Sequence, residues 1–324
     1  MLTTIPKAEL HLHLEGAMTP ALVRDFAKRN GLTLPDDIYD DQDRYIWGSF
    51  PEFLASFDKA SAAIRTKQDY ADLTYFYLTE QAKVGALYVE IFCSPTHAAD
   101  CGLSFDDHLE AVVDGIDRAE KDTGIIGRII MTCVRHVGPE IAVKVARQTA
   151  DCGHSHIVGF GMGGNESMFT QADFYPAFKI ARDAGLGCTT HAGEVEGPQS
   201  VWDAIDKLPV TRIGHGVRSI EDPKLVDTLA KRDIVLEVCP GSNIALSVYP
   251  DYASHPLRKF YDAGVKVTLG SDDPPFFFTS LADEYERAQT QFGFSSAELI
   301  GLTRTALEAA FVDDATKAKL LAKL

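Results

Sequence analysis

Two histidines near the N-terminus, His11 and His13, are separated by a single residue. Side chains two positions apart on an extended strand point to the same face, so both imidazoles would reach into the same space. Imidazole nitrogens are common ligands of zinc and related metals. The pair alone is a weak signal, because a single buried histidine is more often a hydrogen-bonded core residue. It predicts a metal site only if other parts of the chain supply further ligands.

Three other segments carry imidazoles and carboxylates just after an apolar run. His191 ends one run and Glu194 follows it, His215 lies near the end of the next run, and Asp272 and Asp273 follow the last one. These side chains can bind a metal ion, and they can also donate and accept protons. Together with the histidine pair, they are predicted to form one catalytic centre rather than four unrelated structural features.

Apolar runs and helical patterns alternate along the chain, and this alternation predicts how the centre is assembled. The runs that indicate buried strands are residues 8–14, 86–93, 125–134, 157–162, 186–191, 212–217, 234–239 and 265–271. Amphipathic patterns predict helices at residues 105–121, 139–151, 174–184 and 223–232. Eight strands alternating with helices predict a TIM-type (β/α)₈ barrel that spans residues 1–324 as a single domain. Such a barrel carries its catalytic residues at the C-terminal ends of its strands.

The gap after the first strand is much longer than one helix requires. It holds an aromatic stretch at residues 45–54, and an insertion at this point lies at the mouth of a barrel. We expect an extra helical insertion that covers a ligand. The alternative is a helix that only packs on the barrel.

The overall charge limits the partners. The chain has 31 basic and 47 acidic residues and a formal net charge of -16. This balance argues against a nucleic-acid partner and against an anionic membrane surface, because both recruit clustered Lys and Arg. The N-terminal segment is too polar for a signal peptide, no run is long enough to span a membrane, and the six cysteines fit reduced core positions. We therefore expect a cytoplasmic protein, and the sequence does not specify its oligomeric state.

The motifs, taken together and in order, closely resemble the adenosine/adenine deaminase family of the amidohydrolase superfamily. The matching segments are residues 11–17, 190–194, 212–216, 239–243 and 271–274. The resemblance implies a TIM barrel that removes an amino group from a purine by hydrolysis. Two-zinc members of the superfamily usually carry a lysine at the end of the fourth strand. Residues 159–164 contain none, which favours one Zn²⁺ per subunit.

The resemblance also implies a role for each site residue. The zinc ligands would be His11, His13, His191 and Asp272. Glu194 would be the acid that protonates N1 of the purine, His215 would orient the attacking water, and Asp272 would take part in catalysis as well as in metal binding. The substrate contacts would come from His13, Glu15, Gly164 and Asp273. Arg212 is expected to form a structural ion pair beneath the site.

The motifs differ in the substrate that they indicate. Ile91 and Phe92 resemble adenine deaminases, residues 163–166 resemble adenosine deaminases, and Glu15 discriminates poorly between them. We expect an enzyme most like the bacterial adenosine deaminases, which converts adenosine and 2′-deoxyadenosine to inosine and 2′-deoxyinosine in purine salvage. The alternatives are adenine, giving hypoxanthine, or another 6-aminopurine such as an N6-substituted adenine or aminodeoxyfutalosine. A purine-binding module without turnover would predict damaged ligands, and the sequence shows none.

Overall fold

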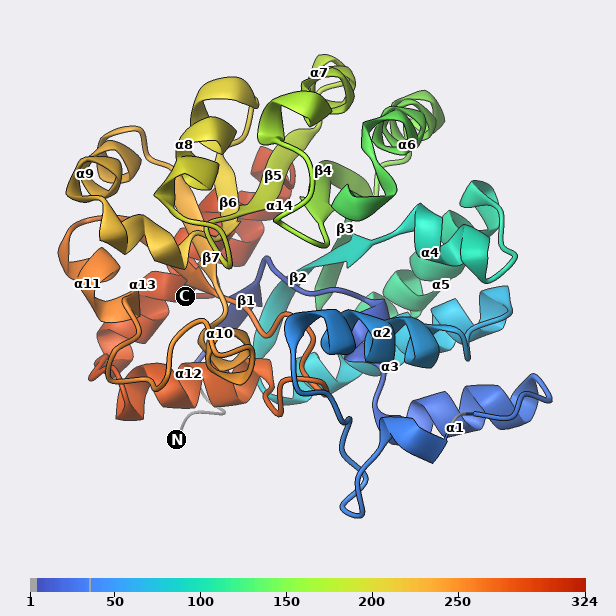
Figure 1. Ribbon diagram of the computed structural model, residues 1–324. Helices are drawn as coiled ribbons and strands as arrows, with labels where there is room; N and C mark the ends of the chain where they lie inside the picture. Colours follow the sequence, from blue (N-terminus) through green and yellow to red (C-terminus); the bar gives the residue numbers. More distant parts are fainter. Residues whose placement is uncertain (1–4, 35) are drawn as a thin grey trace.

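Eight parallel strands form the centre of the computed structural model, which describes residues 5–34 and 36–324. The strands are β1 Lys7–Glu9, β2 Ala86–Cys93, β3 Ile126–Val134, β4 Ile157–Gly163, β5 Gly187–Ala192, β6 Arg212–His215, β7 Val235–Val238 and β8 Lys266–Leu269. Each strand pairs with the next one in the sequence, so their spatial order is β1 to β8 (Figure 1). This arrangement confirms the predicted (β/α)₈ barrel.

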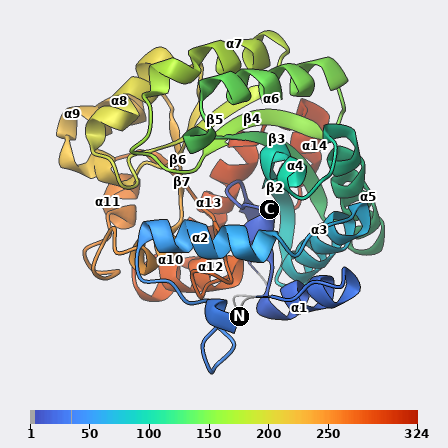
Figure 2. The ribbon, with the colours of Figure 1, turned by 45° about the vertical axis from the view of Figure 1, so that its right-hand side comes forward.

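Helices surround the strands on the outside of the barrel (Figure 2). The helices are α1 Pro20–Arg29, α2 Phe50–Ser61, α3 Lys67–Lys83, α4 Pro95–Asp100, α5 Phe105–Thr123, α6 Pro139–Cys152, α7 Tyr175–Asp183, α8 Pro198–Lys207, α9 Pro223–Lys231, α10 Pro240–Ala245, α11 Leu257–Asp262, α12 Leu281–Thr290, α13 Ser296–Ala309 and α14 Asp314–Leu321. Many begin with proline in the first turn, where a missing N–H costs no helical hydrogen bond. The four predicted helices α5, α6, α7 and α9 agree with the structure to within two residues at each end.

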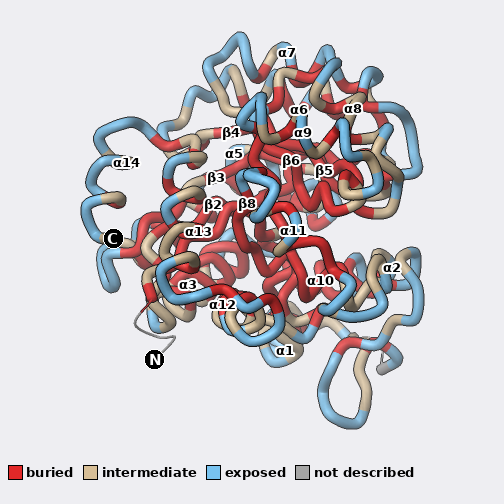
Figure 3. Tube along the Cα trace, turned by 90° about the vertical axis from the view of Figure 1, so that its left-hand side faces the viewer, coloured by how far each residue is buried: buried red, intermediate tan, exposed pale blue. Residues whose placement is uncertain are grey.

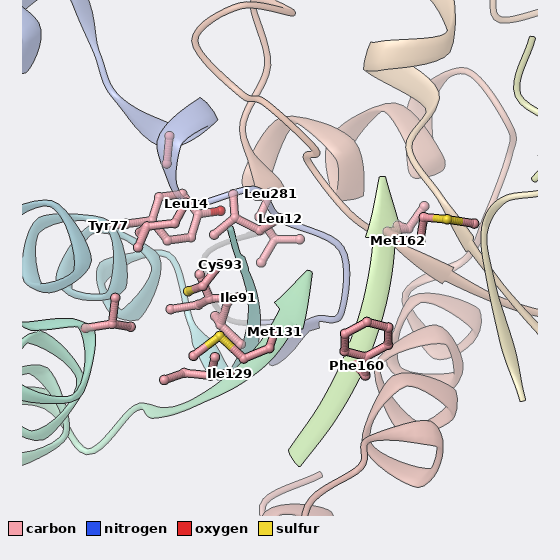
Figure 4. Close-up of a cluster of buried hydrophobic side chains, with 14 of the residues drawn as sticks. Leu12, Leu14, Tyr77, Ile91, Cys93, Ile129, Met131, Phe160, Met162 and Leu281 are labelled. Atoms are coloured by element: carbon pink, nitrogen blue, oxygen red, sulfur yellow. The ribbon is translucent and has the colours of Figure 1, made fainter. Parts of the chain in front are cut away.

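Strand β4 shows how the sequence separates the inside of the barrel from the outside. Phe160 and Met162 are buried among the hydrophobic side chains outside the strands, and the Phe160 ring packs edge-on against Phe178 of α7 (Figure 4). Residues 159, 161 and 163, which point the opposite way, are glycines. A Cβ on Gly163 would lie 3.2 Å from the His13 ring and 3.3 Å from the His191 ring. Gly163 therefore leaves room inside the barrel for His13 and His191.

The barrel closes between the segments that follow β1 and β8. The N–H of His13 donates to the carbonyl of Asp272 at 3.0 Å, and the N–H of Asp272 donates to the carbonyl of His11 at 3.2 Å. Strand β1 is shorter than predicted, because residues 12 and 13 pair only through isolated bridges to Asp272 and Phe92. The closing contacts thus place two histidines beside a carboxylate that is distant in the sequence.

The long segment after β1 forms α1, a loop and then α2. Figures 1 and 2 show α2 lying across one end of the barrel. The loop is fixed to the segment after β8, because Tyr45 stacks on Phe276 with 3.8 Å between ring centroids and Trp47 donates to the Phe276 carbonyl at 3.2 Å. The predicted insertion is therefore present and is attached to the barrel by aromatic contacts.

Arg212 lies fully buried inside the barrel and forms ion pairs with two buried carboxylates. Its distances to Glu90 and to Glu237 are both 2.6 Å, and its guanidinium stacks on Phe311 at 3.6 Å. The predicted structural ion pair is confirmed. The interior around it is buried while the outer helices are exposed on one side (Figure 3). Within the described residues, no helix has the length and apolar composition needed to cross a bilayer.

Candidate active site

Three histidines and one aspartate converge at the C-terminal ends of the strands. The Nε2 atom of His191 lies 3.1 Å from Nε2 of His11 and 3.2 Å from Nε2 of His13. Oδ1 of Asp272 lies 3.5 Å from Nε2 of His11 and 3.3 Å from Nε2 of His13. One donor atom from each of these four residues lies within 4.8 Å of the other three. The sequence predicted that these side chains come together, and the structure brings them together.

The orientation of the rings fits a metal ion. Nδ1 of His11 lies 2.9 Å from Oε2 of the buried Glu237, and Nδ1 of His191 lies 2.7 Å from the carbonyl of Met162. Each Nδ1–H thus has an acceptor, so Nε2 is the nitrogen that is directed at the cluster and free to bind a metal ion. Metal-binding histidines in proteins are held in this way by carboxylates and carbonyls. Three imidazoles and one carboxylate therefore form a metal site of the kind found in amidohydrolases.

A second group of donor atoms, from His215, Cys239 and Asp272, overlaps the first. Burial raises the pKa of the Cys239 thiol well above its ordinary value, so the thiol stays protonated. Only the thiolate is a good ligand. The set of three histidines and Asp272 is therefore the better metal site.

Glu194 and His215 lie beside the metal site. Nε2 of His215 is 3.6 Å from Oε2 of Glu194 and 3.8 Å from Oδ2 of Asp272. Burial raises the pKa of Glu194 well above its ordinary value, and the carboxylates of Asp272 and Glu166 raise it further. Burial lowers the pKa of His215 to about 3. Burial thus favours the protonated form of the Glu194 carboxyl group and the neutral form of the His215 imidazole beside it, an arrangement that suits the transfer of a proton.

His215 and Asp272 also share an unusual backbone conformation. Their φ angles are +59° and +64°, in the left-handed region that residues other than glycine seldom adopt. Such strained residues cluster at functional sites, where the surrounding structure holds them in place. Here the hydrogen bonds from Asp272 to the segment after β1 and from Asn243 Nδ2 to His215 Nδ1 at 3.3 Å supply that support.

One pocket opens onto these groups. Eight of the predicted site residues line it, namely His13, Glu15, Gly164, His191, Glu194, His215, Asp272 and Asp273. The ninth, His11, lies beneath the pocket and is fully buried. The apolar part of the wall comes from Phe50, Phe53, Leu54, Phe57, Phe92 and Phe277. Helix α2 thus forms part of the pocket wall, in agreement with the predicted cover over a ligand.

Asp273 and Glu15 supply carboxyl groups on the pocket wall. Burial raises the pKa of Asp273 well above its ordinary value, and the neighbouring carboxylates add to this. Its Oδ1 is buried and has no hydrogen-bond partner among the residues that the structure describes. The buried Glu15 carboxylate accepts a hydrogen bond from the Tyr70 hydroxyl at 3.0 Å. Asp273 therefore offers an unpaired polar atom to a ligand, whereas the Glu15 carboxylate is held in place by its hydrogen bond with Tyr70.

Gly16 allows the close packing of this wall. A Cβ at position 16 would lie 1.7 Å from Oδ1 of Asp273. Real Cβ atoms do not approach other atoms so closely, so any side chain here would displace the aspartate. The glycine after Glu15 is therefore a steric requirement for the position of Asp273.

Several residues around the site received no role in the sequence analysis. Asn243 bonds His215 as described above and also bonds His255 at 3.1 Å. His108 and His255 are both buried. Neither position has a local pattern that marks it as buried, because both depend on elements packed from elsewhere. His97 and His136 also line the pocket.

Comparisons with known proteins agree with this geometry. The sequence model of a family described as "Adenosine deaminase" matches residues 6–324. The adenine deaminase of Agrobacterium fabrum is 52% identical over 324 residues, which cover 100% of this chain and 99% of the relative. Among solved structures, the adenine deaminase of Arthrobacter aurescens has a TM-score of 0.92 and 32% identity, covering 99% of this chain and 98% of that one. An amidohydrolase from Burkholderia ambifaria with bound Zn has a TM-score of 0.90 and 28% identity, covering 99% and 90%.

These relatives contradict the prediction of adenosine and 2′-deoxyadenosine as substrates, because both the full-length relative and the similar structure are named adenine deaminases. The prediction rested on the resemblance of the segment at 163–166 to adenosine deaminases. Within that segment Gly163 and Gly164 line the pocket, whereas the Glu166 carboxylate bonds backbone N–H groups outside it. Phe92, which pointed to adenine, also lines the pocket.

Proposed function

The chain belongs to the adenosine deaminase family, and on that premise we propose that it hydrolyses adenine to hypoxanthine and ammonia. The observation that carries the choice of adenine is the identity of about half of all residues, over the whole chain, with proteins named adenine deaminase. The geometry supports the reaction, since a metal site, the Glu194 carboxyl group and the His215 imidazole border one pocket.

We infer that the metal ion is Zn²⁺, with one ion per chain held by His11, His13, His191 and Asp272. Three neutral nitrogens and one carboxylate are a typical donor set for this ion, and the Burkholderia ambifaria relative was solved with Zn bound. Such an ion supplies, when bound, a water whose pKa is lowered to about 7 and which is therefore a nucleophile at neutral pH.

The side chains of this protein would carry the remaining steps. Water adds to C6 of the purine, forming a C–O bond, while the protonated Glu194 donates its proton to N1. Oδ2 of Asp272, the oxygen that faces His215, accepts a proton from the water, and His215 holds the water in line with C6. Asp272 then gives this proton to the amino group, and the C6–N bond breaks to release ammonia. The C6 hydroxyl loses its proton to the Glu194 carboxylate as the C6 carbonyl forms, so both acids return to their starting states. Proton transfer by a positioned side chain typically contributes 10²–10⁴-fold to such a rate.

The pocket wall would hold the purine ring in place. Asp273, whose pKa burial raises well above its ordinary value, would in its protonated form donate a hydrogen bond from the unpaired Oδ1 to N7. The N–H of Gly164 would donate to N3, and His13 and Glu15 would contact the edge of the ring. The phenylalanines of α2 would cover the faces of the ring and exclude water. Hydrogen bonds to N1, N3 and N7 would fix the orientation of the purine and bring C6 to the metal site.

The test is steady-state kcat/KM of the zinc-loaded protein on adenine, adenosine, 2′-deoxyadenosine and N6-methyladenine, measured by ammonia release. We expect adenine to be preferred over both nucleosides by about 10³-fold or more, because proteins named adenine deaminase share about half of the residues of this chain. Equal or better turnover of an N9-substituted substrate would refute adenine as the substrate. Preference for N6-methyladenine would move the assignment to the N6-substituted purines.

A further inference from the structure

Glu166, in the loop after β4, lies at the centre of a ring of hydrogen-bond donors. Its carboxylate is 3% exposed. It accepts hydrogen bonds from the N–H groups of Glu194, Val195 and Glu196 at 3.1, 2.9 and 3.0 Å. It also accepts one from the N–H of Gly193 and one from the hydroxyl of Ser200 at 2.6 Å. Four consecutive backbone amides and a hydroxyl therefore converge on one buried side chain.

This arrangement fixes the backbone more firmly than ordinary loop contacts do. Consecutive N–H groups that point into a concavity form an anion-binding nest, and hydrogen bonds to a charged acceptor are about twice as strong as neutral ones. Residues 193–196 belong to no helix or strand, so their N–H groups have no regular backbone carbonyl partners. The Glu166 carboxylate accepts these hydrogen bonds instead.

The fixed segment is the one that carries Glu194. The peptide just before it is held from the same side, because Arg135 and Gln171 both donate to the carbonyl of His191, at 2.9 and 3.1 Å. Glu166 and Gln171 belong to one connection, between β4 and α7, which also contributes Gly164 to the pocket wall. The loop between β4 and α7 thus contacts the ligand pocket through Gly164. It also holds the backbone of β5 at the carbonyl of His191 and the segment after β5 at the N–H groups of residues 193–196.

We propose that Glu166 is a positioning residue, whose carboxylate holds residues 193–196 so that the Glu194 carboxyl group meets N1 of the purine. The inference rests on the proposed function for the role of Glu194. Glu166 itself does not line the pocket, so its effect must pass through the backbone. Loss of the carboxylate should therefore lower kcat, because a displacement of the acid by about 1 Å can cost about 10²-fold in rate.

The main variant is Glu166→Gln, which keeps the shape of the side chain but turns an NH₂ group toward backbone N–H donors. Glu166→Asp keeps the charge on a shorter side chain and should recover part of the rate. Asp69→Asn is the matched control, since Asp69 is also fully buried and accepts hydrogen bonds from the N–H groups of Arg65 and Thr66, at the start of α3. It removes a buried carboxylate of similar bonding at a place where no acid is held.

Three measurements are made on each zinc-loaded variant, below its melting temperature. These are kcat and KM for adenine, zinc content, and hydrogen–deuterium exchange of the peptide that covers residues 193–196. For Glu166→Gln we expect kcat to fall by about 10²-fold with KM within about threefold of the parent value, one zinc per chain, and faster exchange at residues 193–196. For Asp69→Asn we expect a lower melting temperature with kcat and local exchange unchanged.

An unchanged kcat in Glu166→Gln, or a loss of kcat in Asp69→Asn equal to that in Glu166→Gln, would overturn the proposal. If Glu166→Gln does not fold, Ser200→Ala takes its place, since it removes one donor to the carboxylate; an unchanged kcat and exchange rate there would also overturn it. Failure of the proposed function is separable, because it would appear as no turnover of adenine by the parent protein. The exchange measurement would in that case still decide whether Glu166 holds residues 193–196.

Discussion

Nδ1 of His11 lies 2.9 Å from Oε2 of Glu237, and both side chains are fully buried beneath the pocket. Burial alone would raise the pKa of Glu237, but Arg212 and His11 outweigh burial and lower it below its ordinary value. The carboxylate is therefore charged and accepts the Nδ1–H of His11. This contact determines which nitrogen of His11 faces the metal site.

Glu237→Gln is expected to weaken zinc binding by about 10–100-fold, because an outer carboxylate orients a ligating imidazole and makes it more basic. The measurement is zinc affinity by competition with a chelator. Thr189→Val is the control, since it removes only the 3.1 Å hydrogen bond to the other oxygen of Glu237 and leaves the His11 contact in place. Parent-like zinc affinity in Glu237→Gln would show that the contact does not support the metal site.

Glu194→Gln is expected to keep its zinc and to lose about 10²–10⁴-fold in kcat, because the amide has no acidic proton to give to the purine. Glu196→Gln offers a close control. It lies two residues further along the same backbone segment, but its side chain is exposed and outside the pocket, and its kcat should be unchanged. Retained activity in Glu194→Gln would remove this residue from the mechanism.

Gly16→Ala is expected to raise KM for adenine and to lower kcat, because its Cβ would push Asp273 out of place. Gly301→Ala, in α13, is the matched change, since a Cβ at that position meets nothing within 4 Å. That variant should be more stable by about 0.5–1 kcal/mol with unchanged kinetics, as expected for alanine in place of glycine within a helix. Kinetics and the melting temperature of both variants decide the matter, and unchanged kinetics in Gly16→Ala would contradict the steric argument.

His108 is expected to make the protein less stable in acid. Burial lowers its pKa from 6.5 to about 3, and neither ring nitrogen has a hydrogen-bond partner among the described residues. The unfolded chain binds a proton below about pH 6.5 while the folded chain does not, so stability falls as the pH drops from about 6.5 toward 3. At pH 5 this costs about 2 kcal/mol relative to pH 8.

His108→Leu should therefore reduce the loss of unfolding free energy between pH 8 and pH 5 by about 2 kcal/mol. The experiment is urea unfolding at both pH values, and the difference at pH 8, where the histidine is neutral in both states, reports packing alone. An identical pH dependence in the variant and the parent would mean that His108 takes up its proton in the folded state as well.

The sequence alone determined the barrel and the residues of its metal site. The alternation of apolar runs and amphipathic helices is a local property, and it predicted all eight strands. The site residues could be identified because a parallel barrel brings the C-terminal ends of its strands to one face. Any chemical group placed there, such as His191 or Asp272, must then face the others.

The tertiary structure alone decided which side chains support that site. Glu166 and Glu237 resemble many other glutamates in sequence, and their roles depend on backbone amides and on a histidine that lie far away along the chain. The burial of His108 likewise depends on its packing against Tyr70 from another helix. Contacts of this kind have no period and no fixed spacing, because they arise only when separate elements pack together.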